Sequence, residues 1–340
     1  MAAPLWIPSG RRRLSVALAV VGALLLAGCS SSGDRSGSTT TPTTTTTTTP
    51  TTTPTTTPTT SAAATGVPPA VPTAGAYLGA WLHPLAGHVD PSFAQEQAAL
   101  PSVVAATGRP LGFLHIYAPW ARPAPVASMR AVTSAGSTPL LDWGCGPDVA
   151  NVASGADDQL ISAYATSLRS FGAPVLLRWC WEMNLVALHP QIGGPTGFVS
   201  AWNHIRALFR TAGATNVAFV WCPGLTGVDP APYFPGAAAV DWIGVDGYDR
   251  NGTQTFASLF APFYRVWLPS GKPMMVAETG ASASAQVPYV NSIGTDAPAM
   301  PGFKAVAYFD APGPVAAWQF TPEGLQAFAH LAAQPYFQPH

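Results

Sequence analysis

Eight short apolar runs recur along the chain from Ala76, and a Gly-, Pro- or Asp-rich turn and a helical pattern follow each of them. The runs are apolar almost throughout and do not alternate with polar residues, which is typical of strands buried on both faces. We therefore predict a strand in each run. The runs cover residues 77–83, 111–117, 139–144, 174–182, 216–222, 240–248, 273–280 and 303–310.

Strands that alternate with helices build either an open doubly wound sheet or a closed (β/α)8 TIM barrel. The presence of eight repeats in about 265 residues, with no glycine-rich phosphate loop after the first run, favours the barrel. In such a barrel, reactive residues lie at the C-terminal ends of the strands. The clearest helical patterns cover residues 90–107, 157–171, 197–213, 255–269 and 321–334.

The first 28 residues have the features of an export signal. Three arginines, Arg11 to Arg13, precede the apolar stretch "LSVALAVVGALLLAG", which is too short for a membrane-spanning helix. The stretch closes on "LAGC", which resembles the lipobox of bacterial lipoproteins. That resemblance implies that Cys29 is acylated and anchors an exported protein in the cell membrane, facing the extracytoplasmic side. A plain secretory signal is the alternative, and both Sec and twin-arginine export stay open.

Residues 29–71 are dominated by Thr and Pro. Such a segment cannot bury enough apolar surface to offset chain entropy, so we expect a disordered stalk that spaces a domain from the membrane. The remaining residues, 72–340, suffice for one large domain.

The composition narrows the class of ligand. A net charge of −1 excludes an electrostatic case for binding nucleic acid. Only 9% of residues are charged while Trp numbers 11, which suits an uncharged, ring-stacking ligand such as a sugar. Besides Cys29, the cysteines are Cys145, Cys180 and Cys222, which permit one disulfide with open partners and show no C-x-x-C spacing for a metal. We expect a monomer with no cofactor and no metal.

The chain has only four glutamates, and two of them stand where the barrel mouth is expected. Glu96 and Glu323 lie in helical patterns, whereas Glu182 and Glu278 close the fourth and seventh runs. A charge in an apolar run costs several kcal/mol unless it is paired or neutralised. Two carboxyl groups facing one cleft are what glycoside hydrolysis requires, because one protonates the leaving oxygen and the other attacks or activates water.

Four motifs carry a family resemblance. "RWCWEMN" (178–184) resembles the R-P-x-H-E-M-N signature of glycoside hydrolase family 26, the β-mannanase family. "FVWCP" (219–223), "YFPGAAAVDWIGVDGY" (233–248) and "VAETG" (276–280) are similar to that family's fifth, sixth and seventh strand segments. The resemblance implies a retaining endo-β-glycosidase that acts by double displacement, with Glu182 as acid/base, Glu278 as nucleophile and β-1,4-mannan as the default substrate.

The same resemblance implies further site residues. Arg178 matches the family arginine four residues before the acid/base, and Tyr248 matches a tyrosine near the nucleophile; both are expected to help Glu278 stay ionised. Asn184 either bonds sugar hydroxyls or caps a turn, and Asp246 either lines the site or ties down a loop.

Tryptophans at strand ends are candidate platforms for sugar rings, because stacking on an apolar ring face needs no charge. Trp221 and Trp318 are the best placed, followed by Trp143. Each of them can equally be core filler. His83 and His115 are either packed histidines or ligand contacts.

The chain departs from the family pattern around the acid/base. Trp181 replaces the family histidine before Glu182, and "MNLVALHP" (183–190) replaces glycine and aromatic residues, which alters the wall where the leaving sugar would sit. The polysaccharide therefore stays open among β-mannan, β-glucan, β-xylan and an envelope polysaccharide. A non-catalytic glycan-binding lipoprotein and a structural envelope lipoprotein are the alternatives.

Overall fold

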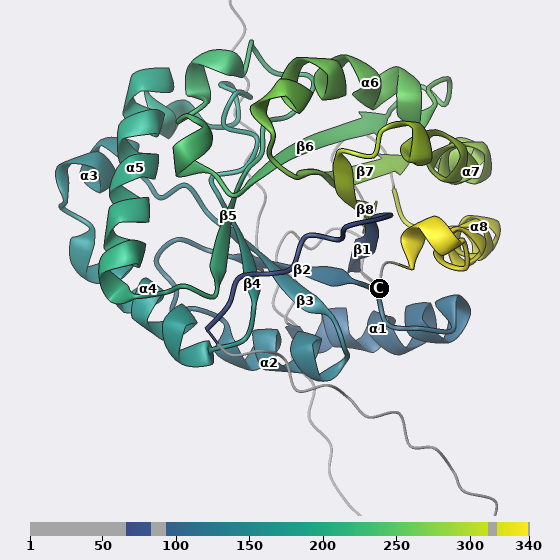
Figure 1. The fold of residues 1–340 in the computed structure, drawn as a ribbon, viewed down its shortest axis with the longest axis horizontal. Coiled ribbons are helices and arrows are strands. Elements are labelled where there is room, and N and C mark those ends of the chain that lie inside the picture. The colour runs from purple at the N-terminus through teal and green to yellow at the C-terminus, as the bar shows by residue number, and fades with distance from the viewer. Residues whose placement is uncertain (1–65, 83–92, 312–317, 339–340) are drawn as a thin grey trace, which may run out of the picture. The chain divides into compact units, whose positions relative to one another are not determined.

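A computed structural model describes residues 66–82, 93–311 and 318–338. Cys29, His83 and the predicted stalk up to residue 65 lie outside these ranges. The described residues form a closed barrel of eight parallel strands in sequence order (Figure 1), so the predicted fold class is confirmed. The strands are β1 (Tyr77–Leu82), β2 (Phe113–Ala118), β3 (Thr138–Trp143), β4 (Val175–Trp179), β5 (Val217–Trp221), β6 (Trp242–Asp249), β7 (Met274–Ala281) and β8 (Phe303–Asp310).

The α-helices lie outside the ring of strands, and each of the five predicted helical segments contains a helix within the described residues (Figure 1). No helix within the described ranges combines the length and apolar character needed to cross a membrane. The helices are α1 (Phe93–Thr107), α2 (Val126–Ser134), α3 (Val149–Ser154), α4 (Asp158–Phe171), α5 (Pro195–Ala212), α6 (Phe256–Trp267), α7 (Gln286–Asp296) and α8 (Pro322–Ala332).

One connection departs from the predicted repeat. Residues 222–241, all of which are described, contain no α-helix and only two single-turn 3-10 segments, Ala231–Tyr233 and Ala237–Ala239. The segment "PGLTGVDPAPYFPG" explains the difference, because prolines remove backbone donors and glycines disfavour a helix interior. The chain after β5 is therefore an irregular loop, and it borders the site described below.

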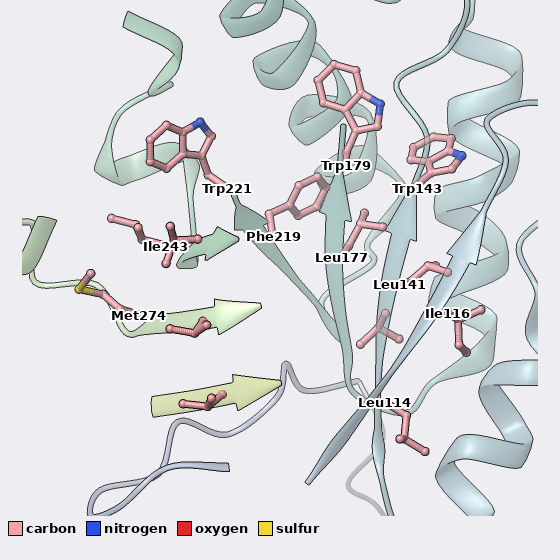
Figure 2. Packing of buried hydrophobic residues seen from close by; sticks show 14 of the residues in the cluster. Leu114, Ile116, Leu141, Trp143, Leu177, Trp179, Phe219, Trp221, Ile243 and Met274 are labelled. Atoms are coloured by element: carbon pink, nitrogen blue, oxygen red, sulfur yellow. The ribbon is translucent and has the colours of Figure 1, made fainter. Parts of the chain in front are cut away.

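The strands bury large side chains on the face that packs against the helices. Figure 2 shows Trp143, Trp179, Phe219 and Trp221 in this layer, from β3, β4 and β5. Trp221 is fully buried and its Nε1 donates to the carbonyl of Tyr233 at 3.0 Å. Trp143, equally buried, stacks on the ring of Tyr164 at 4.1 Å between centroids.

Of the two roles expected for Trp221 and Trp143, core filler is the one that the structure shows, and the sugar platform is wrong. Both side chains point from their strands toward the helices, while Val220 beside Trp221 points into the barrel. A run that is apolar on both faces carries no alternation, so its sequence does not tell which face each side chain takes.

Trp221→Ala should lower the free energy of unfolding by about 3–5 kcal/mol, because it removes a large buried ring and leaves a cavity. Urea denaturation measures this loss. Val266→Ala, at an exposed position of α6, is the control and should change stability by no more than about 0.5 kcal/mol. A Trp221→Ala protein as stable as the wild type would contradict the core assignment.

Candidate active site

A β-bulge in β7 turns Glu278 into the barrel. Val276 pairs with Val245 of β6, but Glu278 pairs with the next residue, Asp246, so Ala277 is the extra residue on β7. Regular alternation would place Ala277 inside the barrel and Glu278 on the helix side. Ala277 keeps its inward position, and the extra residue changes the phase from Glu278 onward, so that the carboxylate of Glu278 also meets inward-facing side chains.

Three donors surround the carboxylate of Glu278. The guanidinium of Arg178 and the hydroxyl of Tyr117 donate to its Oε1, and the hydroxyl of Tyr248 donates to its Oε2. Burial alone would raise the pKa of Glu278. The charge of Arg178, followed by His115 and the two tyrosine hydrogen bonds, outweighs it and holds that pKa below its usual value. Glu278 is therefore the ionised carboxylate of the site.

Arg178 lies beneath the site and not at its surface. Its side chain is fully buried, its Nε donates to Asp142, and its Nη1 donates to both carboxylate oxygens of Asp246 at 2.9 and 2.7 Å. With Nη2 engaged by Tyr117 and Glu278, no N–H group is left for a sugar. The prediction that Arg178 supports Glu278 agrees with these contacts, whereas a direct substrate contact does not.

Asp246 and Asn184 are also structural. Asp246 is buried and accepts from Arg178 and from the thiol of Cys222 at 3.2 Å. Asn184 is buried, donates to the carbonyls of Gly224 and Val228 at 2.8 and 2.9 Å, and accepts from the Gly224 N–H at 2.8 Å. Of the two roles expected for each residue, the structure shows the structural one and corrects the direct substrate contact, because these partners already occupy their polar atoms.

Glu182 lies on a turn, three residues beyond the end of β4, and not on the predicted strand. Cys180 and Glu182 are the non-glycine residues with positive φ in the described chain, at 51° and 53°. Their N–H groups donate to the carbonyls of Trp143 and Cys222 at 2.9 and 2.8 Å, and a disulfide joins Cys180 to Cys145. Such sparsely populated backbone conformations cluster at functional sites, where the surroundings over-determine them.

The environment of Glu182 is the opposite of that of Glu278. Burial, assisted by the negative charge of Glu278, raises the pKa of Glu182 to about 7, although Arg178 and Arg250 oppose this. Gly224 lies directly against the carboxyl group, since a Cβ at that position would stand 3.0 Å from Oε1. Near neutral pH, Glu182 can therefore carry a proton while Glu278 is charged.

The aromatic side chains of the site differ from the predicted set. Trp318 is buried and stacks on Tyr248 with centroids 4.9 Å apart, so it supports that tyrosine and offers no free face. Trp181 is partly exposed and meets the ring of Tyr117 edge-on at 5.1 Å. Trp181 is thus a partly exposed ring beside Glu182.

Tyr117, Asp142 and His115 complete the polar cluster. The sequence does not predict Tyr117 and Asp142 as site residues, and it leaves His115 open between packing and ligand contact. The structure places His115 in the buried layer, with its Nδ1 2.7 Å from Asp142. The available signal for Tyr117 was its place at the end of the second apolar run.

Glu182→Gln should stabilise the protein at pH 8. Between pH 4.5 and about 7 the folded protein keeps a proton on Glu182 that the unfolded chain has lost, so stability falls as pH rises through this window. Gln lacks this penalty of up to about 3 kcal/mol. Urea denaturation at pH 5 and pH 8 measures the difference, with Glu323→Gln on α8 as control. Parallel pH dependence of wild type and Glu182→Gln would contradict the raised pKa.

Sequence comparison finds a distant curated relative of this chain. No family model matches the chain. Endoglucanase H of Acetivibrio thermocellus is 26% identical in an alignment of 204 positions, which covers 54% of this chain and 22% of that protein. The chain thus matches about a fifth of the length of this curated relative.

Solved structures similar to this chain include β-mannanases. A β-mannanase from a symbiotic protist of the termite Reticulitermes speratus, solved with a gluco-manno-oligosaccharide, has a TM-score of 0.58 at 14% identity, covering 82% of this chain and 96% of its own. A Bacillus subtilis mannanase has a TM-score of 0.57 at 17% identity over 76% of this chain and 86% of its own. The family 26 β-mannanase of Bacteroides ovatus has a TM-score of 0.53 at 14% identity, covering 78% of this chain and 90% of its own. The chain therefore shares the (β/α)8 fold of the family 26 β-mannanases, in agreement with its motifs.

Proposed function

We propose that the protein is a retaining β-glycosidase that hydrolyses a β-linked polysaccharide with Glu278 as nucleophile and Glu182 as acid/base. The observation that carries this proposal is the opposite tuning of two neighbouring carboxyl groups. Glu278 has a lowered pKa and Glu182 a pKa of about 7. Such a divergence assigns acid and base roles to a carboxyl pair.

In the first step, the carboxylate of Glu278 attacks the anomeric carbon. The bond to the leaving oxygen breaks, and Glu182 gives that oxygen its proton. The negative charge of Glu278 helps to raise the pKa of Glu182. Esterification of Glu278 removes that charge. The pKa of Glu182 then falls, and the residue becomes a base that deprotonates the water for the second step. Water attack releases the sugar with retained configuration.

The substrate class follows from the resemblance and from the accessible ring. Family 26 enzymes act by default on β-1,4-mannan, and the similar solved structures are β-mannanases, while the curated relative is an endoglucanase. Trp181 offers a partly exposed ring for stacking on an uncharged sugar beside Glu182. We propose endo-hydrolysis of β-mannan or β-glucan as the first reactions to test.

Glu278→Ala and Glu182→Ala should each lower kcat/KM on the responsive polysaccharide by at least about 10³-fold. Panels of mannan, glucan, xylan and arabinan identify that polysaccharide. Azide should restore turnover of Glu278→Ala with inverted product. Glu182→Ala should still release a good leaving group such as 4-nitrophenol and then stall. Glu323→Ala, an exposed glutamate of α8, is the control, and equal residual rates of the two site variants on both substrate types would contradict the roles.

We also propose that the protein is exported and anchored through a lipid on Cys29. The support is the "LAGC" box after a basic segment and an apolar stretch, followed by the Thr/Pro-rich segment up to residue 71.

Cys29→Ala should move the protein from the membrane fraction to the soluble fraction or block removal of the signal. Fractionation and intact-mass measurement detect either result. Ser30→Ala, the adjacent change, should be processed and anchored as in the wild type. An anchored, normally processed Cys29→Ala protein would rule out the lipid anchor.

A further inference from the structure

The turn that carries Glu182 has an unfavourable backbone conformation. Cys180 and Glu182 both lie in the left-handed region, with φ of 51° and 53°, where a residue with a Cβ is disfavoured. Such a conformation persists only where the surrounding groups fix it. The place of the Glu182 carboxyl group therefore depends on the contacts of this turn, and these contacts come from two neighbouring strands.

On the side of β5, hydrogen bonds hold the turn from Glu182 onward. The Glu182 N–H donates to the carbonyl of Cys222 at 2.8 Å. The side-chain amide of Asn184 exchanges two hydrogen bonds of 2.8 Å with the backbone of Gly224. These bonds join the acid-bearing turn to the segment that follows β5.

On the side of β3, a covalent bond holds the start of the turn. The N–H of Cys180 donates to the carbonyl of Trp143 at 2.9 Å. The sulfur of Cys180 is bonded to that of Cys145, two residues beyond the end of β3, and both cysteines are buried. The disulfide thus restrains the turn two residues before Glu182.

The end of the disulfide on Cys145 is packed into the core. Trp143, two residues earlier, is fully buried and stacks on Trp120 with ring centroids 4.2 Å apart. Gly146, the next residue, lies against the same Trp120 ring, since a Cβ at that position would stand 3.2 Å from it. Close-packed interiors allow little displacement. Cys145 is therefore a fixed point from which the disulfide holds the turn of Glu182.

Proton transfer depends on this placement more than nucleophilic attack does. An acid must lie within hydrogen-bond reach of the departing oxygen, and a misplacement of about 1 Å can cost about 100-fold in rate. The donors to Glu278 are Arg178, Tyr117 and Tyr248, which lie on strands and not on the turn. Loss of the disulfide would therefore displace the acid and leave the nucleophile in place.

We propose that Cys145 and Cys180 are positioning residues, whose disulfide holds the carboxyl group of Glu182 at the departing oxygen. This inference rests on the proposed glycosidase activity and adds two residues to its proton-transfer machinery. A disulfide that served stability alone would, once broken, slow the hydrolysis of all substrates alike. With a positioning role, the loss depends on how much the leaving group needs a proton.

The test compares 2,4-dinitrophenyl and phenyl β-glycosides of mannobiose, cellobiose and xylobiose. Dinitrophenolate departs without a proton, whereas phenolate needs one. Cys145→Ala breaks the bond and leaves the sequence of the turn unchanged. On the accepted sugar, it should lower kcat/KM at least about tenfold for the phenyl compound and less than about twofold for the dinitrophenyl compound. Because kcat/KM reports the first chemical step, slower hydrolysis of the glycosyl enzyme does not affect the comparison.

Two further proteins separate positioning from stability. Wild type that is unfolded in urea, reduced with dithiothreitol and refolded in its presence should match Cys145→Ala, and reoxidation should restore the rate on the phenyl compound. Met129→Ala truncates a buried side chain on the outer helix α2 and is the matched control. It should lower stability but leave the ratio of the two kcat/KM values unchanged. Thiol counting verifies the state of the disulfide, and circular dichroism verifies the fold.

The outcomes separate the two proposals. Equal losses on both leaving groups, no loss on either, or failure of both Cys145→Ala and reduced wild type to fold would overturn the positioning role. The glycosidase assignment would then stand on the activity of the oxidised wild type. If the oxidised wild type hydrolyses no glycoside and no polysaccharide of the panels, the glycosidase and the positioning role are overturned together.

Discussion

A single buried guanidinium group joins the interior of this barrel to its reactive end. Arg178 on β4 bonds Asp142 on β3, Asp246 on β6 and Glu278 on β7, and all of these side chains are buried. Removing one partner of a buried ion pair leaves an uncompensated charge, at a cost of about 3–5 kcal/mol. The cation that keeps Glu278 ionised therefore also links four strands, so the stability of the barrel and the charge of Glu278 depend on the same group.

The two glutamates show how one barrel mouth supports unlike protonation states. Glu278 sits where strand side chains converge and receives a cation and two hydroxyl donors. Glu182 lies on a turn against Gly224, where the charge of Glu278 helps to raise its pKa. The difference arises from backbone placement, since a bulge directs one residue inward and a left-handed turn presents the other.

The sequence predicted the elements well and the side-chain directions poorly. Continuous apolar runs identified all eight strands, because strands buried on both faces need apolar residues throughout. The same continuity concealed that Trp221 faces the helices. The bulge at Ala277 shifts the phase of β7 and has no composition signal of its own.

The candidate site shows the same division. The sequence predicts Glu182 and Glu278 as the site carboxyl groups, because an unpaired charge inside an apolar run is energetically costly. Tyr117 was missed because it reaches Glu278 across 161 positions of sequence, a proximity that only the closed barrel creates. The sequence leaves Asn184 open between a sugar contact and a turn cap, and its amide ties two loops together. Sequence alone does not distinguish a polar group that contacts a ligand from one that holds loops in place.

The disulfide between Cys145 and Cys180 makes the restraint on the turn that carries Glu182 depend on redox conditions. The bond ties the segment after β3 to the residue two positions before Glu182. Disulfides persist in oxidising compartments and are rare where thiols are kept reduced. In a reducing cytoplasm, the freshly made chain would hold this turn by backbone hydrogen bonds alone. The geometry described here therefore belongs to the oxidised chain, and the full set of restraints on this turn exists only where the disulfide can form.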